Sequence, residues 1–380
     1  MTVRRKKAVL AISFFAIFIF LIYFSSQCIY EIRNSLKICI TILIPSLFPY
    51  LVCSKVCLKL GIANCIEKLF DPITRVLFNV PGCSITAFLF GSFGGYPIGA
   101  KIVSDLYSNN RCTKSEAERM ITFCNNSGPV FIIVTIGIVM YNSFELGFIL
   151  FASHILGSLI TGILFRNHTS KDGNSQKVLQ TSRGILITKS TTEIITESIS
   201  ESVLAILNLC GCVIFFSAII NIVKSLGIID IIIKVLSYFK INSVLTDGIL
   251  TGFLEITQGI DMISHLNSKI VPELCAISFL LSWSGISIIL QVISQTAKYR
   301  LSKSVLFTSK LMHSLISGSI TFILCLLYLH LPHMNLTILT NSNFSFIRLL
   351  YYLEPGIISL SLFIILPHLL LRKEPTSDKI

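Results

Sequence analysis

Charged side chains are scarce in this sequence. Only 13% of its 380 residues are charged and 53% are hydrophobic, whereas soluble domains carry about 25% charged residues. So few charges cannot cover the surface of a soluble protein of this length. The composition therefore excludes a soluble enzyme, a disordered chain and, despite the net charge of +12, a nucleic-acid-binding protein. It leaves an integral membrane protein that crosses the lipid bilayer several times.

Motifs that carry out chemistry are absent as well. The sequence contains no nucleophile with a matching base, no residues at metal-ligand spacing and no phosphate-binding loop of the ATPase type. We therefore predict a protein that is not an enzyme, holds no cofactor or metal and is not an ATP-driven pump. The twelve cysteines lie mostly in apolar runs, where cysteine packs as a small hydrophobic residue.

Hydrophobic segments recur along the chain, and nearly all of them reach the length of about 20 residues that a bilayer requires. The first follows the basic run Arg4–Lys7, and we interpret it as an uncleaved helix rather than a signal peptide. A short helix at the membrane interface is expected over residues 62–81. The segments span residues 8–28, 36–60, 83–107, 117–141, 146–165, 203–227, 243–266, 272–294, 305–331 and 352–371.

Two of these segments are unlike ordinary membrane helices. Residues 83–107 contain four glycines and a proline between Gly91 and Gly99, a composition that does not maintain a regular helix. Residues 243–266 place Glu255 and Gln258 at membrane depth. Both segments are therefore candidates for re-entrant hairpins.

The chain also contains an internal repeat. Residues 34–62 match residues 200–228, and Gly91 pairs with Gly252. Two later helices match in the same order. Because the order is preserved with similar spacing, we predict two related halves. The predicted domains are an N-terminal membrane helix (1–33), a first repeat (34–166), a polar cytoplasmic linker (167–199), a second repeat (200–331) and a C-terminal membrane helix with its tail (332–380).

The distribution of Lys and Arg bears on the topology, because these residues favour cytoplasmic loops. If all segments cross, about 15 basic residues lie inside and about 12 outside; with two hairpins the counts become about 21 and about 6. The hairpin arrangement also inverts the second repeat relative to the first. We predict an all-α polytopic membrane protein with about eight transmembrane helices, two re-entrant hairpins and cytoplasmic termini. The alternative is a bundle of about ten crossing helices.

The predicted hairpin tips and the polar residues beside them are the candidate substrate site, because irregular backbone at membrane depth must be buried or line a cavity. Lys101 either pairs with an anionic substrate or extends to the interface. Glu255 either binds a proton, cation or amine, or forms a structural salt bridge, for example with Lys101. His154 and His313 are interpreted as packing residues rather than a proton relay. The candidate substrate-binding residues are Gly94, Gly95, Tyr96, Pro97, Gly99, Lys101, Asn125, Asn126, Ser127, Gly128, Glu255, Gln258, Ser282 and Ser284.

Four strings carry a resemblance to a known family. They are PSLFP at Pro45–Pro49, GSFGGYPIGAK at Gly91–Lys101, EAER at Glu116–Arg119 and FCNNSGP at Phe123–Pro129. With these strings the chain resembles the YlbJ-type sporulation integral membrane proteins, a family with a nucleoside-recognition Gate domain. The resemblance covers roughly residues 30–370 and is strongest over 44–137. It implies a spore-forming bacterium, a role in cortex formation, and transport of dipicolinate across the outer forespore membrane from the mother cell.

The expected function is thus transport of a small aromatic anion, dipicolinate, through the lipid bilayer. A nucleoside or nucleobase transporter is an alternative, because the Gate relationship points to concentrative nucleoside transporters, which have two re-entrant hairpins. A third alternative is a membrane scaffold for spore envelope assembly that transports nothing. The partners expected are the anionic substrate and lipid, with no nucleic acid, and the oligomeric state is left open.

Overall fold

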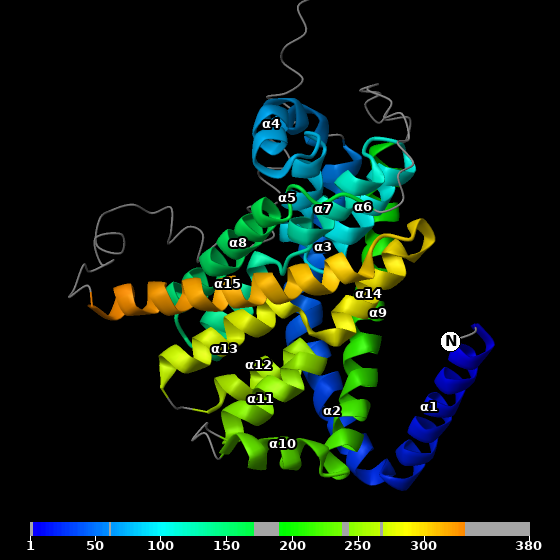
Figure 1. Cartoon of the computed structure of the whole chain (residues 1–380), viewed down its shortest axis with the longest axis vertical. Coiled ribbons are helices and arrows are strands. Elements are labelled where there is room, and N and C mark those ends of the chain that lie inside the picture. The colour runs from blue at the N-terminus through cyan, green and yellow to red at the C-terminus, as the bar shows by residue number, and fades with distance from the viewer. Residues whose placement is uncertain (1–2, 61, 171–189, 238–242, 267–268, 331–380) are drawn as a thin grey trace, which may run out of the picture. The chain divides into compact units, whose positions relative to one another are not determined.

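Every regular element is a helix in the part of the chain that the computed structural model describes, residues 3–60, 62–170, 190–237, 243–266 and 269–330 (Figure 1). The prediction of an all-α polytopic membrane protein is confirmed. Within these residues four helices are long and apolar enough to cross a bilayer, or five if one bent pair counts as a single span. The four are Phe144–Leu164, Thr191–Ser225, Ile270–Tyr299 and Lys303–Tyr328.

The chain begins with a sharp bend between two helices. Helix α1 (Val3–Tyr23) meets α2 (Ser25–Ile38) at an angle of 94°. From Ser25 the helix continues through the π-helical turn η1 (Cys39–Leu43) into α3 (Ile44–Lys59). The first long helix of the repeat therefore starts before the predicted boundary at residue 34.

The elements after this bend occur twice in the same order. A long helix, a short amphipathic helix, a pair of short helices, a broken helix and a final long helix form each set. The first set is α2–η1–α3, α4 (Ile62–Phe78), α5 (Ser84–Gly94), α6 (Ile98–Ser108), α7 (Lys114–Cys124), η2 (Val130–Met140) and α8 (Phe144–Leu164). The second is α9 (Thr191–Ser225), α10 (Ile228–Ser237), α11 (Ser243–Leu254), α12 (Ile256–Ser264), α13 (Ile270–Trp283), α14 (Gly285–Thr296), the 3-10 turn η3 (Ala297–Tyr299) and α15 (Lys303–His330).

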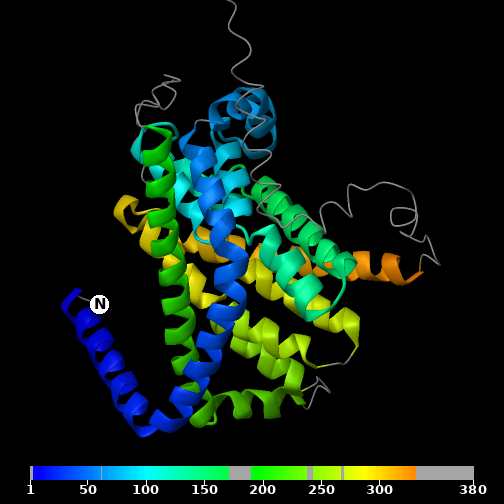
Figure 2. The same ribbon diagram turned by 180° about the vertical axis from the view of Figure 1, so that it is seen from behind.

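The two long helices that open these sets run antiparallel along one another (Figure 2). Near one end, Cys28 Sγ lies 3.5 Å from Asn221 Oδ1. Near the other end, Lys59 Nζ pairs with Glu197 Oε2 at 3.0 Å. Equivalent helices that point in opposite directions are the arrangement that inverted repeats require.

Both irregular segments double back on themselves. In α11 and α12, Gly248 faces Ile263, and a Cβ on Gly259 would overlap the Cα of Gly252. In α5 and α6, the two ends meet because Cys83 Sγ lies 3.7 Å from the carbonyl oxygen of Arg111. A single straight helix would place these paired residues at opposite ends, so each segment is a helical hairpin.

Two segments expected to be continuous helices are broken in the structure. The expected helix over 117–141 ends at Cys124 and resumes at Val130, because Asn125 has a non-helical backbone and Pro129 cannot donate a helical hydrogen bond. The expected helix over 272–294 breaks at Ser284, which has a left-handed φ of 70°. The expected crossing at 352–371 and the predicted domain 332–380 lie outside the described residues, and α9 extends into the predicted linker.

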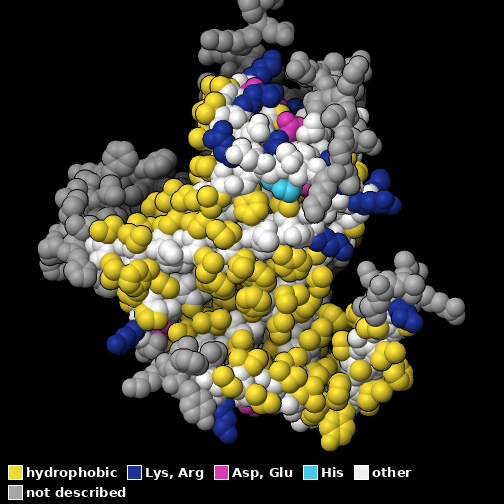
Figure 3. Space-filling view, viewed as in Figure 1, with side chains coloured by type: hydrophobic (Ala, Val, Ile, Leu, Met, Phe, Trp, Pro, Cys, Tyr) yellow, Lys and Arg dark blue, Asp and Glu magenta, His cyan; other side chains and the backbone are white. Residues whose placement is uncertain are grey.

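The surface is divided by side-chain type. Hydrophobic side chains cover most of the face formed by α10 to α15, as Figure 3 shows. Lys and Arg side chains gather at the end formed by α4 to α7. The apolar face carries large exposed residues such as Leu311, Leu315 and Phe322, which are 45%, 52% and 49% exposed. Such a surface is suited to lipid rather than to water.

Candidate functional site

Each hairpin tip lies against the break in the helix that follows it. In the first half, Gly95 has a φ of +71°, and a Cβ there would lie 3.5 Å from the amide nitrogen of Gly128. In the second half, a Cβ on Gly285 would lie 3.2 Å from the amide nitrogen of Ile256. In both halves, therefore, the tip of a helical hairpin packs against the break in the helix that follows it.

The glycines of the first hairpin make room for this contact. A Cβ on Gly91 or on Gly99 would overlap the carbonyl oxygen of Cys124, the last residue of α7. That carbonyl therefore sits in a notch between the two glycines. We had expected Gly99 to let a ligand approach the backbone, but in the structure its open side is filled by α7.

Lys310 lies on α15 with only 1% of its surface exposed. Its side-chain nitrogen is 2.6 Å from the carbonyl oxygen of Asn125 and 3.2 Å from the hydroxyl oxygen of Tyr96. It also lies 4.6 Å from the centre of the Tyr96 ring, at cation–π distance. The Tyr96 hydroxyl donates in turn to the carbonyl oxygen of Leu281 at 3.1 Å. One lysine thus joins the first hairpin, the first helix break and the second half of the chain.

Two histidines extend this cluster, and both are fully buried. His154 Nε2 accepts from the amide of Ser127 at 3.0 Å, so its Nδ1 carries the hydrogen and donates to Ser282 Oγ at 3.0 Å. His313 Nε2 donates to the carbonyl oxygen of His154 at 2.8 Å, and the two rings are 4.7 Å apart. His154 therefore connects the helix breaks of the two halves, a role beyond the helix packing that we had expected.

The adjacent asparagines differ in their contacts. Asn126 donates from Nδ2 to Ser92 Oγ at 3.1 Å and to the carbonyl oxygen of Phe123 at 2.8 Å. Asn125 is 1% exposed, and neither its amide nitrogen nor its amide oxygen has a hydrogen-bond partner within the described residues. An unpaired buried amide is unfavourable by about 1–3 kcal/mol, so the Asn125 side chain is a group that a ligand can satisfy.

Glu255 occupies the tip of the second hairpin and is 1% exposed. Its carboxylate caps α12 by accepting from the amide of Gln258 at 2.9 Å. The Gln258 side chain is turned away from this carboxylate and donates to Ser35 Oγ at 2.6 Å. No lysine or arginine pairs with Glu255 in the part of the chain that is described, and the suggested ion pair with Lys101 is not formed.

Most of the predicted site residues are thus brought together, but Lys101 is not among them. It is exposed, and its charge acts on Lys55 and Glu201 rather than on the buried cluster. The Gln258 side chain bonds to Ser35 of α2 instead. The predicted residues that lie at the tips and breaks are Gly94, Gly95, Tyr96, Pro97, Gly99, Asn125, Asn126, Ser127, Gly128, Glu255, Ser282 and Ser284.

Lys310 is the functional candidate that the sequence interpretation missed. It is the one Lys, Arg, Asp or Glu residue in the predicted membrane segment 305–331. A charge in such a position is itself a signal, because ionisable residues inside membrane helices are rare and usually functional. Lys101 became a candidate because it lies in the glycine-rich string, close to Tyr96 in sequence. In the structure, the hydrogen bonds of Tyr96 go to other residues.

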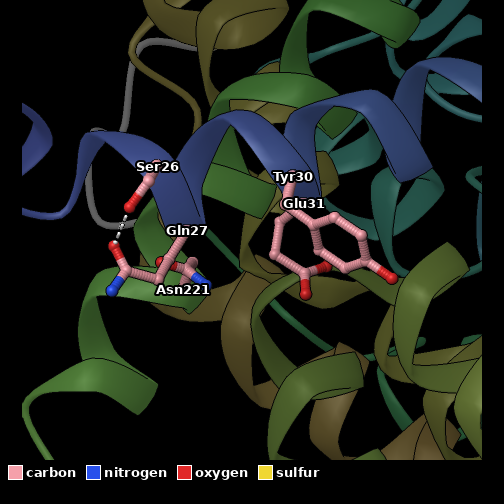
Figure 4. A pocket seen from close by; sticks show the side chains of 5 residues that line it. All are labelled: Ser26, Gln27, Tyr30, Glu31 and Asn221. Carbon is pink, nitrogen blue, oxygen red and sulfur yellow. Dashed lines mark hydrogen bonds between the residues drawn. The ribbon is translucent and has the colours of Figure 1, made fainter.

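A separate hollow of about 380 Å³ lies at the surface beside the bend that opens α2. Ser26, Gln27, Tyr30 and Glu31 line it from α2, and Asn221 lines it from α9 (Figure 4). The hollow contains none of the predicted site residues. Its polar groups partly bond to one another, as Ser26 Oγ does to Gln27 Oε1 at 2.9 Å.

Comparisons with known proteins connect the chain to one curated relative. It is similar to the sporulation integral membrane protein YlbJ of Bacillus subtilis (strain 168), with 27% identity over 270 residues. The match covers 66% of this chain and 66% of the relative's length. No protein-family model matches the chain. No solved structure matches it either.

Proposed function

We propose that this protein is a membrane transporter for a small organic anion, with dipicolinate as its substrate. The observation that carries the proposal is Lys310, a basic residue that is 1% exposed and has no carboxylate partner among the described residues. Ionisable side chains inside membrane helices usually mark a substrate or ion pathway. A buried basic group without a counter-ion is suited to an anion, which supplies the missing counter-charge.

The groups around Lys310 suit dipicolinate, a flat aromatic ring with two carboxylates. Lys310 and the unpaired amide of Asn125 supply donors for a carboxylate. The N-terminus of α6 lies beside Asn125, and no side chain caps it, so its amides favour an anion as well. The ring of Tyr96 supplies a flat surface for the ring of the substrate.

The architecture supports movement of the anion rather than storage. Antiparallel equivalent helices, paired hairpins and broken helices are features of secondary transporters, in which one part rocks against another around a central site. Lys310, Asn125 and His154 are sealed from solvent, so access to them requires such a movement. A scaffold has no need of buried, partly unpaired polar groups at opened helices.

The biological setting is proposed from the curated relative, whose printed name is a sporulation integral membrane protein. We infer a role in spore formation, in the mother-cell (outer forespore) membrane. The basic end formed by α4 to α7 faces the cytoplasm in this proposal, because Lys and Arg favour that side. We propose cytoplasmic termini as well.

Uptake of labelled dipicolinate into liposomes that contain the purified protein tests the proposal. We expect uptake well above that of protein-free liposomes, and competition by unlabelled dipicolinate. Competition by uridine alone would favour the nucleoside transporter. If neither compound is transported, the scaffold alternative is favoured, and it predicts that variants with apolar residues at Asn125, Asn126 and Gly95 leave spores normal.

A further inference from the structure

The hydrogen bonds of Lys310 show for how many of its side-chain N–H groups the protein supplies an acceptor. A lysine ammonium has three hydrogens, and a neutral amine has two. The protein supplies two acceptors, the carbonyl oxygen of Asn125 at 2.6 Å and the hydroxyl oxygen of Tyr96 at 3.2 Å. The Tyr96 hydroxyl can accept because its own hydrogen goes to Leu281. Within the described residues, these two bonds match a neutral amine.

Charge balance leads to the same conclusion. Lys55 is also largely buried, at 9% exposure, but its nitrogen lies 3.6 Å from the carboxylate of Glu201. Lys310 is buried more deeply and has no such partner in the described chain. An isolated ammonium in this position would be strongly disfavoured, so a lysine without a counter-ion gives up its proton.

The titratable groups that face Lys310 do not change this balance. They are Tyr96 from the first hairpin, His154 from α8 and His313 from α15 itself. The break after α7 presents a carbonyl and amide groups, and the break after α13 presents a carbonyl and hydroxyls. His154 is neutral because its Nε2 accepts a hydrogen bond, and the Nδ1 of His313 has no partner within the described residues. No carboxylate of the described chain is among these groups.

We propose that Lys310 binds a proton together with the transported carboxylate, so that the protein is a proton–anion symporter. This inference rests on the proposed function. Without the anion, Lys310 is a neutral amine. When a carboxylate enters, the amine takes up one proton from the solvent, and its third N–H bond points to the carboxylate, which supplies the missing counter-charge. The proton and the anion leave together on the other side, and the amine is restored.

Proton uptake on ligand binding tests the inference directly. The purified full-length protein is placed in weak buffer with a pH-sensitive dye, and dipicolinate is added while its binding is measured by equilibrium dialysis. We expect about one proton taken up per dipicolinate bound to the wild type. Lys310→Arg should bind without proton uptake, because arginine remains charged at all relevant pH values. The exposed Lys298→Gln is the control and should behave as the wild type.

A second measurement needs no variant. In liposomes, an inward proton gradient should drive accumulation of dipicolinate above its outside concentration, and collapse of the gradient should end it. Binding or transport without proton uptake and without a response to the gradient would overturn the inference and leave the proposed function intact. Absence of any binding or transport would overturn both.

Discussion

The two hairpins share a backbone plan, but a basic residue, Lys310 of α15, lies against the first tip, whereas an acidic residue, Glu255, forms the second. At the first tip, Lys310 lies against Tyr96, and no carboxylate of the described chain balances it. At the second tip, Glu255 caps α12, and no Lys or Arg of the described chain pairs with it. The sequence repeat pairs Glu255 with Gly94, so the second half has its own carboxylate where the first half has a glycine. The difference suggests that the first half receives its carboxylate from the substrate.

Replacing one glycine of each hairpin by alanine should disrupt the backbone arrangement that the two hairpins share. Gly99→Ala would force a Cβ into the carbonyl oxygen of Cys124, and Gly259→Ala would force one into the backbone of Gly252. Overpacking of this kind costs about 1–3 kcal/mol, so both variants should unfold at clearly lower temperature in detergent. Gly211→Ala, where nothing lies within 4 Å, is the matched control and should not lower it. If both hairpin variants matched this control, the close contacts would be refuted.

Removal of the Tyr96 hydroxyl tests the difference between the two hairpin tips. Tyr96→Phe loses the acceptor for Lys310 and the donor to Leu281. We expect about tenfold weaker dipicolinate binding, since a hydrogen bond to a charged group contributes about 1.5–3 kcal/mol. Tyr141→Phe removes another partly buried hydroxyl, which donates to Glu273, and should leave binding unchanged. Equal effects of the two variants on affinity would contradict the placement of the site.

A substitution at the second hairpin tip is expected to affect the stability of the protein more than its affinity for dipicolinate. Glu255→Ala removes the side chain that caps α12, and loss of an N-cap costs about 1 kcal/mol. Thermal unfolding should therefore shift by a few degrees, while dipicolinate affinity changes less than in Tyr96→Phe. Glu255→Gln keeps an acceptor oxygen and should recover much of the stability. Complete loss of transport in Glu255→Gln would instead assign the coupling ion to this carboxylate.

The smallest effect is expected at Lys101. It is exposed, and the hydrogen bonds at the first tip go to Lys310. Lys101→Gln should change dipicolinate affinity by no more than about twofold, as for an exposed charge outside a binding site. The sequence left Lys101 either as a partner of an anionic substrate or as a residue that extends to the interface, so a large loss of affinity in this variant would favour the first of these over the structure.

Much of the fold was predictable because it depends on composition and order along the chain. Low charge indicated a membrane protein, and the clustered glycines indicated an interrupted segment before any helix was placed. The repeat could be recognised because both halves keep residues such as Gly91 and Gly252, which the structure places in the corresponding arms of the two hairpins.

The site was only partly predictable, because the contacts that build it join distant parts of the chain. Asn125 and Ser127 could be chosen because a proline and two asparagines are unusual within an apolar helix. Lys310 and His154 could not be placed beside them, since only the crossing of α8 and α15 brings these side chains to the break. Proximity in sequence to Tyr96 favoured Lys101, although that side chain points elsewhere.

The role of Lys310 is tested most directly by the affinity of the purified protein for labelled dipicolinate. Equilibrium dialysis measures this affinity for the wild type and for Lys310→Gln. We expect the variant to bind at least about 30-fold more weakly, because loss of one partner of a buried charge pair costs about 2–5 kcal/mol. Lys298→Gln should bind as the wild type does. Equal affinity of Lys310→Gln and the wild type would contradict the claim that Lys310 holds the substrate.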